Sequence, residues 1–217
     1  MFNNHTEKYI IHVFTDSGVT SGEEAMIKKA VDDAMALYGC SIVFKGKGSW
    51  NSGDLCLADA VLGSAEADSR GRINASSVMD AIVGRMKMRG QKGAMILITS
   101  KEITLKDKWC FGAAKVGGKA SVQSMAYFSR LTDEKKEKAL RRTFLHETGH
   151  LFRLAADAKR DNVEERNGRH CLSPGCVMRQ SPTLTVLMEL ANEEDPANCL
   201  CSLCREDLRR FRKNYHE

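Results

Sequence analysis

The sequence predicts an α/β fold with a mostly parallel sheet and one antiparallel edge strand, and three observations point to it. A strand-like run at residues 9–16 precedes an amphipathic helix pattern over 23–39 and a second strand-like run over 41–46. A strand, helix, strand unit of this kind places its two strands in parallel. Residues 93–100 form a short apolar run that is typical of a strand buried on both faces. Two extended runs in 109–131 meet at paired glycines, which favours a tight antiparallel hairpin.

The segments between these strands are predicted to be one loop-rich stretch and two further helices. Residues 46–71 are rich in Gly, Ser, Asp and Ala, which favours a long loop with one short helix. A helical pattern covers residues 76–90. Thr132 or Asp133 can cap the last long helix, whose first turn is acidic. From Ala155 onward we expect irregular chain with short helices.

Length and composition indicate one functional unit. The chain has 217 residues, of which 42% are hydrophobic and 28% charged, and its formal net charge is +5. These values are ordinary for a soluble protein, and so weak a basic excess selects no partner. We expect two subdomains, 1–154 and 155–217. The N-terminal residues lack a signal-like pattern and no apolar run reaches about 20 residues, so we expect a cytoplasmic protein that does not bind membranes.

The most specific motif is H-E-T-G-H, at residues 146–150 inside the last long helix. Histidines four positions apart lie on one face of a helix, so His146 and His150 can bind one metal ion. In hydrolases zinc takes three protein ligands and a water whose pKa falls to about 7. Glu147 is then placed to act as the general base for that water. The alternative is a chance occurrence, because the motif fixes only three positions.

The cysteines indicate a second metal site. Five of the eight lie from Cys171 onward, and in a reducing compartment thiols and metal ligands are more common than disulfides. Cys171 and Cys176 with Cys201 and Cys204 offer four thiolates in two short pairs, which suits a closed tetrahedral structural zinc. Cys199 is an alternative to Cys201. The other three cysteines have no partner at ligand spacing and are expected to be small buried residues: Cys40, Cys56 and Cys110.

Together with H-C-L-S-P-G-C-V-M at residues 170–178 and C-S-L-C at 201–204, the H-E-T-G-H motif resembles the archaemetzincin family of zinc peptidases. The pattern of that family is H-E-x-x-H-x-x-G-x-x-H-C, four residues, C-x-M, a spacer and C-x-x-C. Weaker similarity begins at about Arg70. The resemblance implies a metzincin-like twisted sheet, an active-site helix that carries the motif, and a small irregular C-terminal subdomain. It also implies two zinc ions, one catalytic and one structural.

One departure from the family pattern concerns the third histidine. The pattern places its glycine at Arg153 and its histidine at Ala156, whereas the histidine that precedes a cysteine here is His170. A continuous helix would carry His170 about 30 Å from His150, since each residue adds about 1.5 Å. The helix must therefore end soon after His150. We expect residues 154–167 to form an inserted excursion that brings His170 back to the catalytic zinc.

The excursion leaves two questions open. Its return needs a turn, and Asn167 and Gly168 suit the left-handed conformation that the missing family glycine would supply. The third ligand could also be a carboxylate, on the model of peptidases with a distant glutamate ligand. The rival candidates are Asp157, Glu164 and Glu165.

The resemblance also implies which residues lie below and above the catalytic zinc. Met178 corresponds to a methionine that lies beneath the zinc as an apolar floor, and the alternative is an ordinary core methionine. In the superfamily an antiparallel edge strand above the zinc holds an extended substrate by main-chain hydrogen bonds. The matching run is 109–116, whose small residues Gly112, Ala113 and Ala114 would let a substrate backbone approach. Tight packing of that strand would explain the same small residues.

The sequence thus predicts a zinc-dependent peptidase that acts on a peptide or protein substrate, and two alternatives stay open. The C-x-x-C pair lies beside a basic helix pattern at residues 204–216, which would fit a zinc-stabilised module that binds nucleic acid or protein. Glu206 and Asp207 dilute that basic patch, so nucleic acid is not the expected partner. An inactive relative would bind zinc without turnover. The sequence selects neither a cleavage preference nor an oligomeric state.

Overall fold

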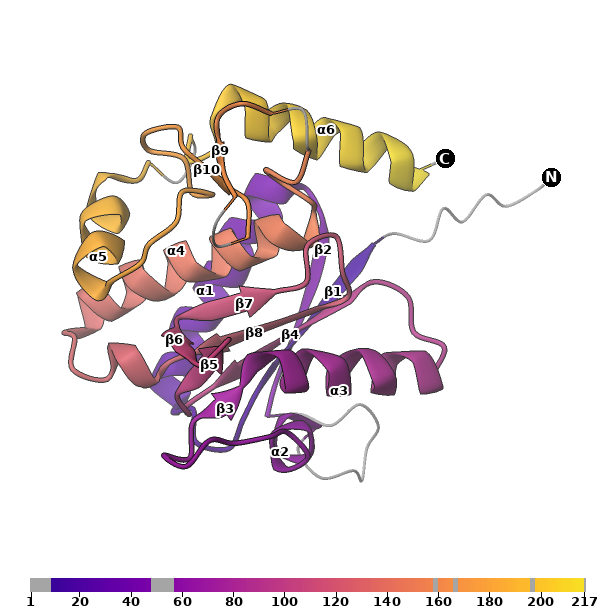
Figure 1. Ribbon diagram of the computed structural model, residues 1–217, viewed down its shortest axis with the longest axis vertical. Coiled ribbons are helices and arrows are strands. Elements are labelled where there is room, and N and C mark those ends of the chain that lie inside the picture. Colours follow the sequence, from indigo (N-terminus) through magenta and orange to yellow (C-terminus); the bar gives the residue numbers. More distant parts are fainter. Residues whose placement is uncertain (1–8, 48–56, 158–159, 166–167, 196–197, 217) are drawn as a thin grey trace.

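The computed structural model describes residues 9–47, 57–157, 160–165, 168–195 and 198–216. Two of the residues discussed above, Cys56 and Asn167, lie outside these ranges. Figure 1 shows a central sheet with helices on both faces and a smaller group of loops and helices at one end. This is the mixed α/β architecture that the sequence predicts.

The central sheet has five strands in the order β2-β1-β4-β8-β7. The first four run in parallel, and β7 pairs antiparallel with β8 at one edge, with Gly112 opposite Gln123. The predicted parallel sheet with one antiparallel edge strand is therefore confirmed. The strands are β1 (Ile10–Thr15), β2 (Ser41–Gly46), β4 (Ala94–Thr99), β7 (Gly112–Ala114) and β8 (Ala120–Ser124).

Four helices cover the two faces of this sheet. On one face α1 (Ser21–Tyr38) packs with α4 (Asp133–Leu151), and on the other lie α2 (Leu57–Gly63) and α3 (Ala75–Met88) (Figure 1). All six residues of β4 are buried because its alternating side chains enter both cores: Ile96 and Ile98 join α1 and α4, whereas Met95 and Leu97 join α2 and α3.

Capping residues explain where the helices begin and end, and most of them can be recognised in the sequence. Thr20 and Glu23 form a capping box at the start of α1, and Gly39 ends the helix with a φ of 55°. Asn74 caps α3 through its side chain. At α4 the capping position is Thr132, although its side chain makes no capping hydrogen bond, and the acidic first turn complements the helix dipole.

A second, three-stranded sheet next to the edge strand was not predicted. It contains β3 (Ile73–Asn74), β5 (Ile103–Leu105) and β6 (Lys108–Cys110), and β5 and β6 form a two-residue hairpin through Lys106 and Asp107. Both turn residues have positive φ, 50° and 64°, without being glycine. The predicted single run from Trp109 is consequently split between β6 and β7. In the next hairpin only the first of the two paired glycines, Gly117, has a positive φ.

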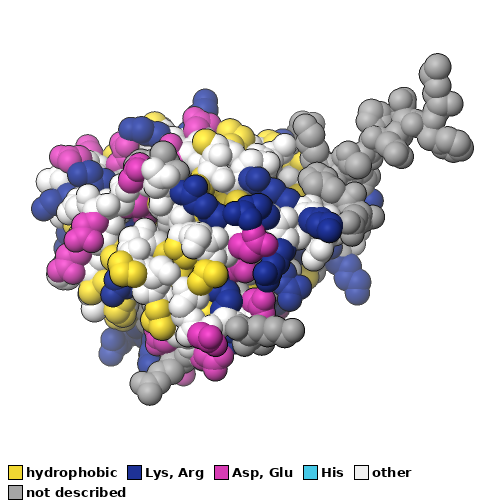
Figure 2. Space-filling view, turned by 90° about the horizontal axis from the view of Figure 1, so that it is seen from above, with side chains coloured by type: hydrophobic (Ala, Val, Ile, Leu, Met, Phe, Trp, Pro, Cys, Tyr) yellow, Lys and Arg dark blue, Asp and Glu magenta, His cyan; other side chains and the backbone are white. Residues whose placement is uncertain are grey.

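The chain after α4 contains more regular structure than expected. A short antiparallel pair, β9 (Val163–Glu164) and β10 (His170–Cys171), is followed by α5 (Leu184–Glu193) and α6 (Ser202–His216). Figure 2 looks onto the face that α6 crosses, where Lys and Arg side chains gather with Asp and Glu beside them. Within the part of the chain that the structure describes, no helix is both long and apolar enough to cross a membrane.

The helix that carries H-E-T-G-H ends at Leu151, soon after His150, as the distance argument requires. The left-handed residue at this end is Arg153 itself, with a φ of 60°. The expected left-handed conformation is present at Gly168, with a φ of 106°, whereas Arg153 adopts it at the position of the family glycine itself. An exposed arginine adopts a conformation here that favours glycine.

Arg153→Gly should stabilise the folded chain by about 0.5–1 kcal/mol, because it removes the Cβ that is strained at positive φ. Denaturant unfolding of the variant and the parent protein measures this change. Arg153→Ala is the matched control, since it removes the same exposed side chain but keeps the Cβ. Equal stabilities of the two variants would contradict the assignment of strain to this residue.

Candidate metal centre and active site

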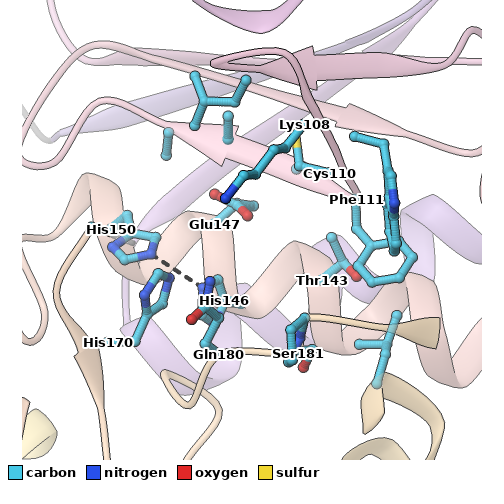
Figure 3. A pocket seen from close by; sticks show the side chains of 18 of the residues that line it. Lys108, Cys110, Phe111, Thr143, His146, Glu147, His150, His170, Gln180 and Ser181 are labelled. Carbon is cyan, nitrogen blue, oxygen red and sulfur yellow. Dashed lines mark hydrogen bonds between the residues drawn. The ribbon is translucent and has the colours of Figure 1, made fainter. Parts of the chain in front are cut away.

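Three histidines from two separate elements converge at one end of the sheet (Figure 3). His146 and His150 lie one turn apart on α4, and β10 brings His170 beside them. The ring centroids of His146 and His150 are 4.8 Å apart, and each lies 5.1 Å from that of His170. The structure therefore brings together the three imidazoles that the sequence assigns to one metal ion.

The distances in this cluster fit a zinc ion. The Nε2 atoms of His146 and His150 are 3.1 Å apart. Two ligands at about 2.0–2.1 Å from a tetrahedral zinc would be about 3.3 Å apart. The Nδ1 atom of His146 lies 2.8 Å from the Val177 carbonyl oxygen, to which it donates, so its Nε2 lone pair faces the other rings.

Electrostatics keeps the three rings in the form that binds a cation. Burial lowers the pKa of all three imidazoles, and the neighbouring rings lower it further for His146 and His150. The pKa of His150 falls to about 3 and that of His146 lies well below its usual value. At neutral pH each ring is therefore uncharged and keeps a nitrogen lone pair.

The carboxylate of the motif lies beneath the edge strand. Glu147 is 6% exposed, and burial raises its pKa to about 8. A Cβ at Gly112 on β7 would lie 2.7 Å from Cγ of Glu147 and 2.8 Å from its Oε1, which is too close for any side chain. Gly112 thus lets the strand lie directly against Glu147. Figure 3 shows Glu147 and the three imidazoles facing the same pocket.

The methionine and a helix glycine meet on the other side of α4. Met178 is fully buried, and a Cβ at Gly149 would lie 2.3 Å from its sulfur and 3.2 Å from the hydroxyl oxygen of Tyr38. That hydroxyl donates to the Leu145 carbonyl oxygen over 2.6 Å. The absence of a side chain at position 149 therefore allows Met178 to pack directly against the metal-binding helix.

A buried ion pair that sequence reasoning missed fixes the same loop. Arg142 is 1% exposed and pairs with Glu194, while its Nη2 donates to the carbonyl oxygens of Cys176 and Arg179 at 3.2 and 3.4 Å. These two carbonyls flank Val177, whose own carbonyl accepts from His146. Arg142 therefore holds the loop that orients the first imidazole. Glu194 lies 52 residues further along the chain, so no local signal reveals its partner.

The four predicted cysteines form a second cluster. The Sγ atoms of Cys171 and Cys201 are 3.6 Å apart, as are those of Cys176 and Cys204. Two thiolates at about 2.3 Å from a tetrahedral zinc would be about 3.8 Å apart, whereas a disulfide would need about 2.0 Å. The geometry thus fits a closed metal site. It includes Cys201 and leaves out Cys199, the alternative.

The remaining cysteines and the rival ligands lie elsewhere. Cys199 is a buried neutral thiol whose pKa burial raises to about 12. Cys40 and Cys110 are only partly buried, contrary to expectation. Of the carboxylates, Asp157 contacts Arg210 and Glu165 contacts Arg169, while Glu164 pairs with His170 through the β9–β10 ladder. The metal-ligand cluster within the described residues includes none of these three.

A cleft of about 570 Å³ lies between the edge strand and α4, a size typical of ligand sites. Gly112, Ala113 and Ala114 line it from β7, and Ala113 also packs in the core beside α3. Trp109 and Phe111 form an aromatic wall, with ring centroids 5.1 Å apart. The small residues of this strand therefore line the cleft and also pack tightly behind it.

The fold is that of archaemetzincin structures. The archaemetzincin of Methanopyrus kandleri aligns with a TM-score of 0.69 at 19% identity, over 98% of this chain and 99% of that one. A zinc-dependent peptidase of Methanocorpusculum labreanum gives 0.64 at 19% identity, over 91% and 99%. The archaemetzincin of Archaeoglobus fulgidus, complexed with malonate, gives 0.61 at 18% identity, over 91% and 99%.

These likenesses establish the fold, and they confirm at that level the resemblance found in the sequence. No protein-family model matches the chain, and no curated protein matches it either. At 18–19% identity, the chemistry of the site has to be argued from this chain's own residues.

Gly149→Ala should destabilise the protein by about 1–3 kcal/mol, because the new methyl group overlaps the sulfur of Met178. Gly84→Ala is the matched control in the interior of α3, where a Cβ meets no atom within 4 Å. There the better helix propensity of alanine should stabilise the protein by about 0.5–1 kcal/mol. Denaturant unfolding measures the change in the free energy of unfolding for each variant. Changes of the same sign in the two variants would contradict the packing argument.

Proposed function

We propose that this chain is a zinc-dependent metallopeptidase. The observation that carries the proposal is the convergence of His146, His150 and His170 beside Glu147, beneath an open edge strand. Three neutral imidazoles with a free face match a catalytic zinc site better than a structural one, which is closed by four ligands. The names of the structural neighbours, archaemetzincin and zinc-dependent peptidase, support the same class.

The residues of the site divide between two zinc ions. The three histidines would hold a catalytic zinc, which when bound supplies a Lewis acid and lowers the pKa of water. Glu147 takes a proton from the attacking water and passes it to the leaving amine. The cysteine cluster would hold a structural zinc.

The edge strand supplies the binding surface for the substrate. The β7 strand pairs with β8 on one side only in the central sheet, so an extended peptide could add to its other side by main-chain hydrogen bonds. Gly112 and Ala114 present little bulk to such a peptide. A peptide bound in this way would lie between β7 and the three imidazoles, with Glu147 beside the bond to be cut.

The purified protein should contain two zinc ions per chain, one removed readily by a chelator and one retained far longer. The histidine site has three protein ligands and opens into the cleft, whereas the four cysteines enclose their ion. Elemental analysis before and after brief chelation measures both. Protein that has intact thiols but retains no metal after incubation with zinc would overturn both assignments.

Glu147→Gln should abolish hydrolysis, by at least about 100-fold, and leave the fold and the zinc content unchanged. Glutamine has nearly the same shape as glutamate but cannot accept the proton. Digestion of an unbiased peptide library by the wild-type and variant proteins, with zinc analysis of both, tests this. Equal activity of the two proteins would remove Glu147 from the reaction. Zinc binding without wild-type activity would favour an inactive relative or a zinc-stabilised binding module.

A further inference from the structure

The excursion between the two halves of the zinc motif brings a buried arginine to the cysteine cluster. The Arg160 side chain is 7% exposed. Its Nη1 donates to the sulfur of Cys204 and its Nη2 to the sulfur of Cys171, both over 3.5 Å. Asn162 adds a donor 3.6 Å from the sulfur of Cys171. One guanidinium therefore bridges the two pairs of cysteines, which come from distant parts of the chain.

A network of its own holds Arg160 in this position. Its guanidinium pairs with Asp207 on α6 at 2.5 Å, and Nε and Nη2 also donate to the side-chain oxygen of Asn162. Asp207 is 9% exposed and accepts a second hydrogen bond from the backbone of Ala155, at the start of the excursion. Arg160 thus has few other conformations available, and its N–H groups stay directed at the sulfur atoms.

The charge of the cluster explains why a cation belongs there. Four thiolates and one Zn²⁺ carry two net negative charges, and three of the four cysteines are buried. Buried charge is costly unless hydrogen bonds and counter-charges compensate it. The planar guanidinium of Arg160 supplies one positive charge and two separate N–H donors, which a lysine ammonium could not direct at both sulfurs.

The same segment adjoins the third histidine. The Asn162 carbonyl oxygen accepts from the backbone of Leu172 over 2.9 Å, and Val163 in β9 lies opposite Cys171 in β10. Cys171 is joined by a peptide bond to His170. Arg160 can therefore affect the third imidazole through the strand pair that holds it.

We infer that Arg160 is the counter-cation of the cysteine metal site, and that the excursion serves to place it there rather than to close over the cleft. In this role Arg160 is a positioning residue, because it acts through the metal site and touches neither substrate nor the reacting atoms. Its effect on His170 rests on the proposed peptidase function, whereas its effect on the cysteine site does not.

The test compares metal release from zinc-loaded variants into a chromogenic chelator. Arg160→Gln should release the slowly exchanging zinc about 10- to 100-fold faster than wild type. Asp207→Asn removes the charge of the pair but keeps the guanidinium and its hydrogen bonds to Asn162, so its release rate should rise much less than that of Arg160→Gln. The double variant Arg160→Gln/Asp207→Asn leaves no unpaired buried charge, so it should remain folded and still release zinc rapidly. The matched control is Arg210→Gln, because Arg210 is an exposed arginine on α6, the helix that carries Asp207.

Two outcomes would overturn the inference. One is release from Arg160→Gln, and from the double variant, at the wild-type rate. The other is equally fast release from Asp207→Asn and Arg160→Gln, which would show that the ion pair matters and the sulfur contacts do not. Absorption of the cobalt-substituted proteins provides a second readout, since loss of the sulfur contacts should shift the thiolate charge-transfer band. A wild-type protein without peptidase activity would refute the proposed function and leave these metal measurements intact.

Discussion

The structure depends on one constraint: an imidazole from outside the metal-binding helix must reach the two imidazoles on it. The helix supplies His146 and His150 through its own geometry, whereas His170 arrives on a strand of two residues. So short a strand cannot fix a ring by itself. The position of His170 therefore depends on the loops and the metal cluster on either side of it.

The histidine cluster and the cysteine cluster are linked through the same short segments of the chain. Cys171 follows His170 directly, and Cys176 lies two residues before Met178, so the cysteine cluster fixes both the third imidazole and the segment that carries Met178. A hydrogen bond from the backbone of Cys171 to the Met178 carbonyl, at 3.0 Å, joins the two segments. Loosening of the cysteine cluster would consequently disturb the histidine cluster from two directions, although none of the four cysteines lines the cleft.

The sequence predicted those features that depend on spacing. Strand and helix periodicity indicated the parallel strands of the sheet. Ligand spacing indicated the two helix histidines and the cysteine pairs, whereas His170 was assigned from the family resemblance. The sequence could not reveal partners far apart in the chain, such as Glu194 for Arg142 or Arg160 for the cysteines, because nothing local marks them. The β5–β6 hairpin was missed for a different reason, since Lys106 and Asp107 adopt left-handed conformations without the glycine that usually signals such a turn.

The excursion between α4 and β10 shows how a long segment can separate His150 from His170 in the chain while the two rings stay in contact. Doubling the length of a loop raises its closure free energy by only about 0.6 kcal/mol, so added length is a small burden when the two ends are fixed. Here the first end is bound to Asp207 through Ala155, and the other end enters β10. Between them, Arg160 and β9 bind the cysteine cluster and the strand beside it. A lid needs a segment with few such contacts, whereas the contacts of Arg160, Asn162 and β9 bind this excursion to the cysteine cluster and to β10.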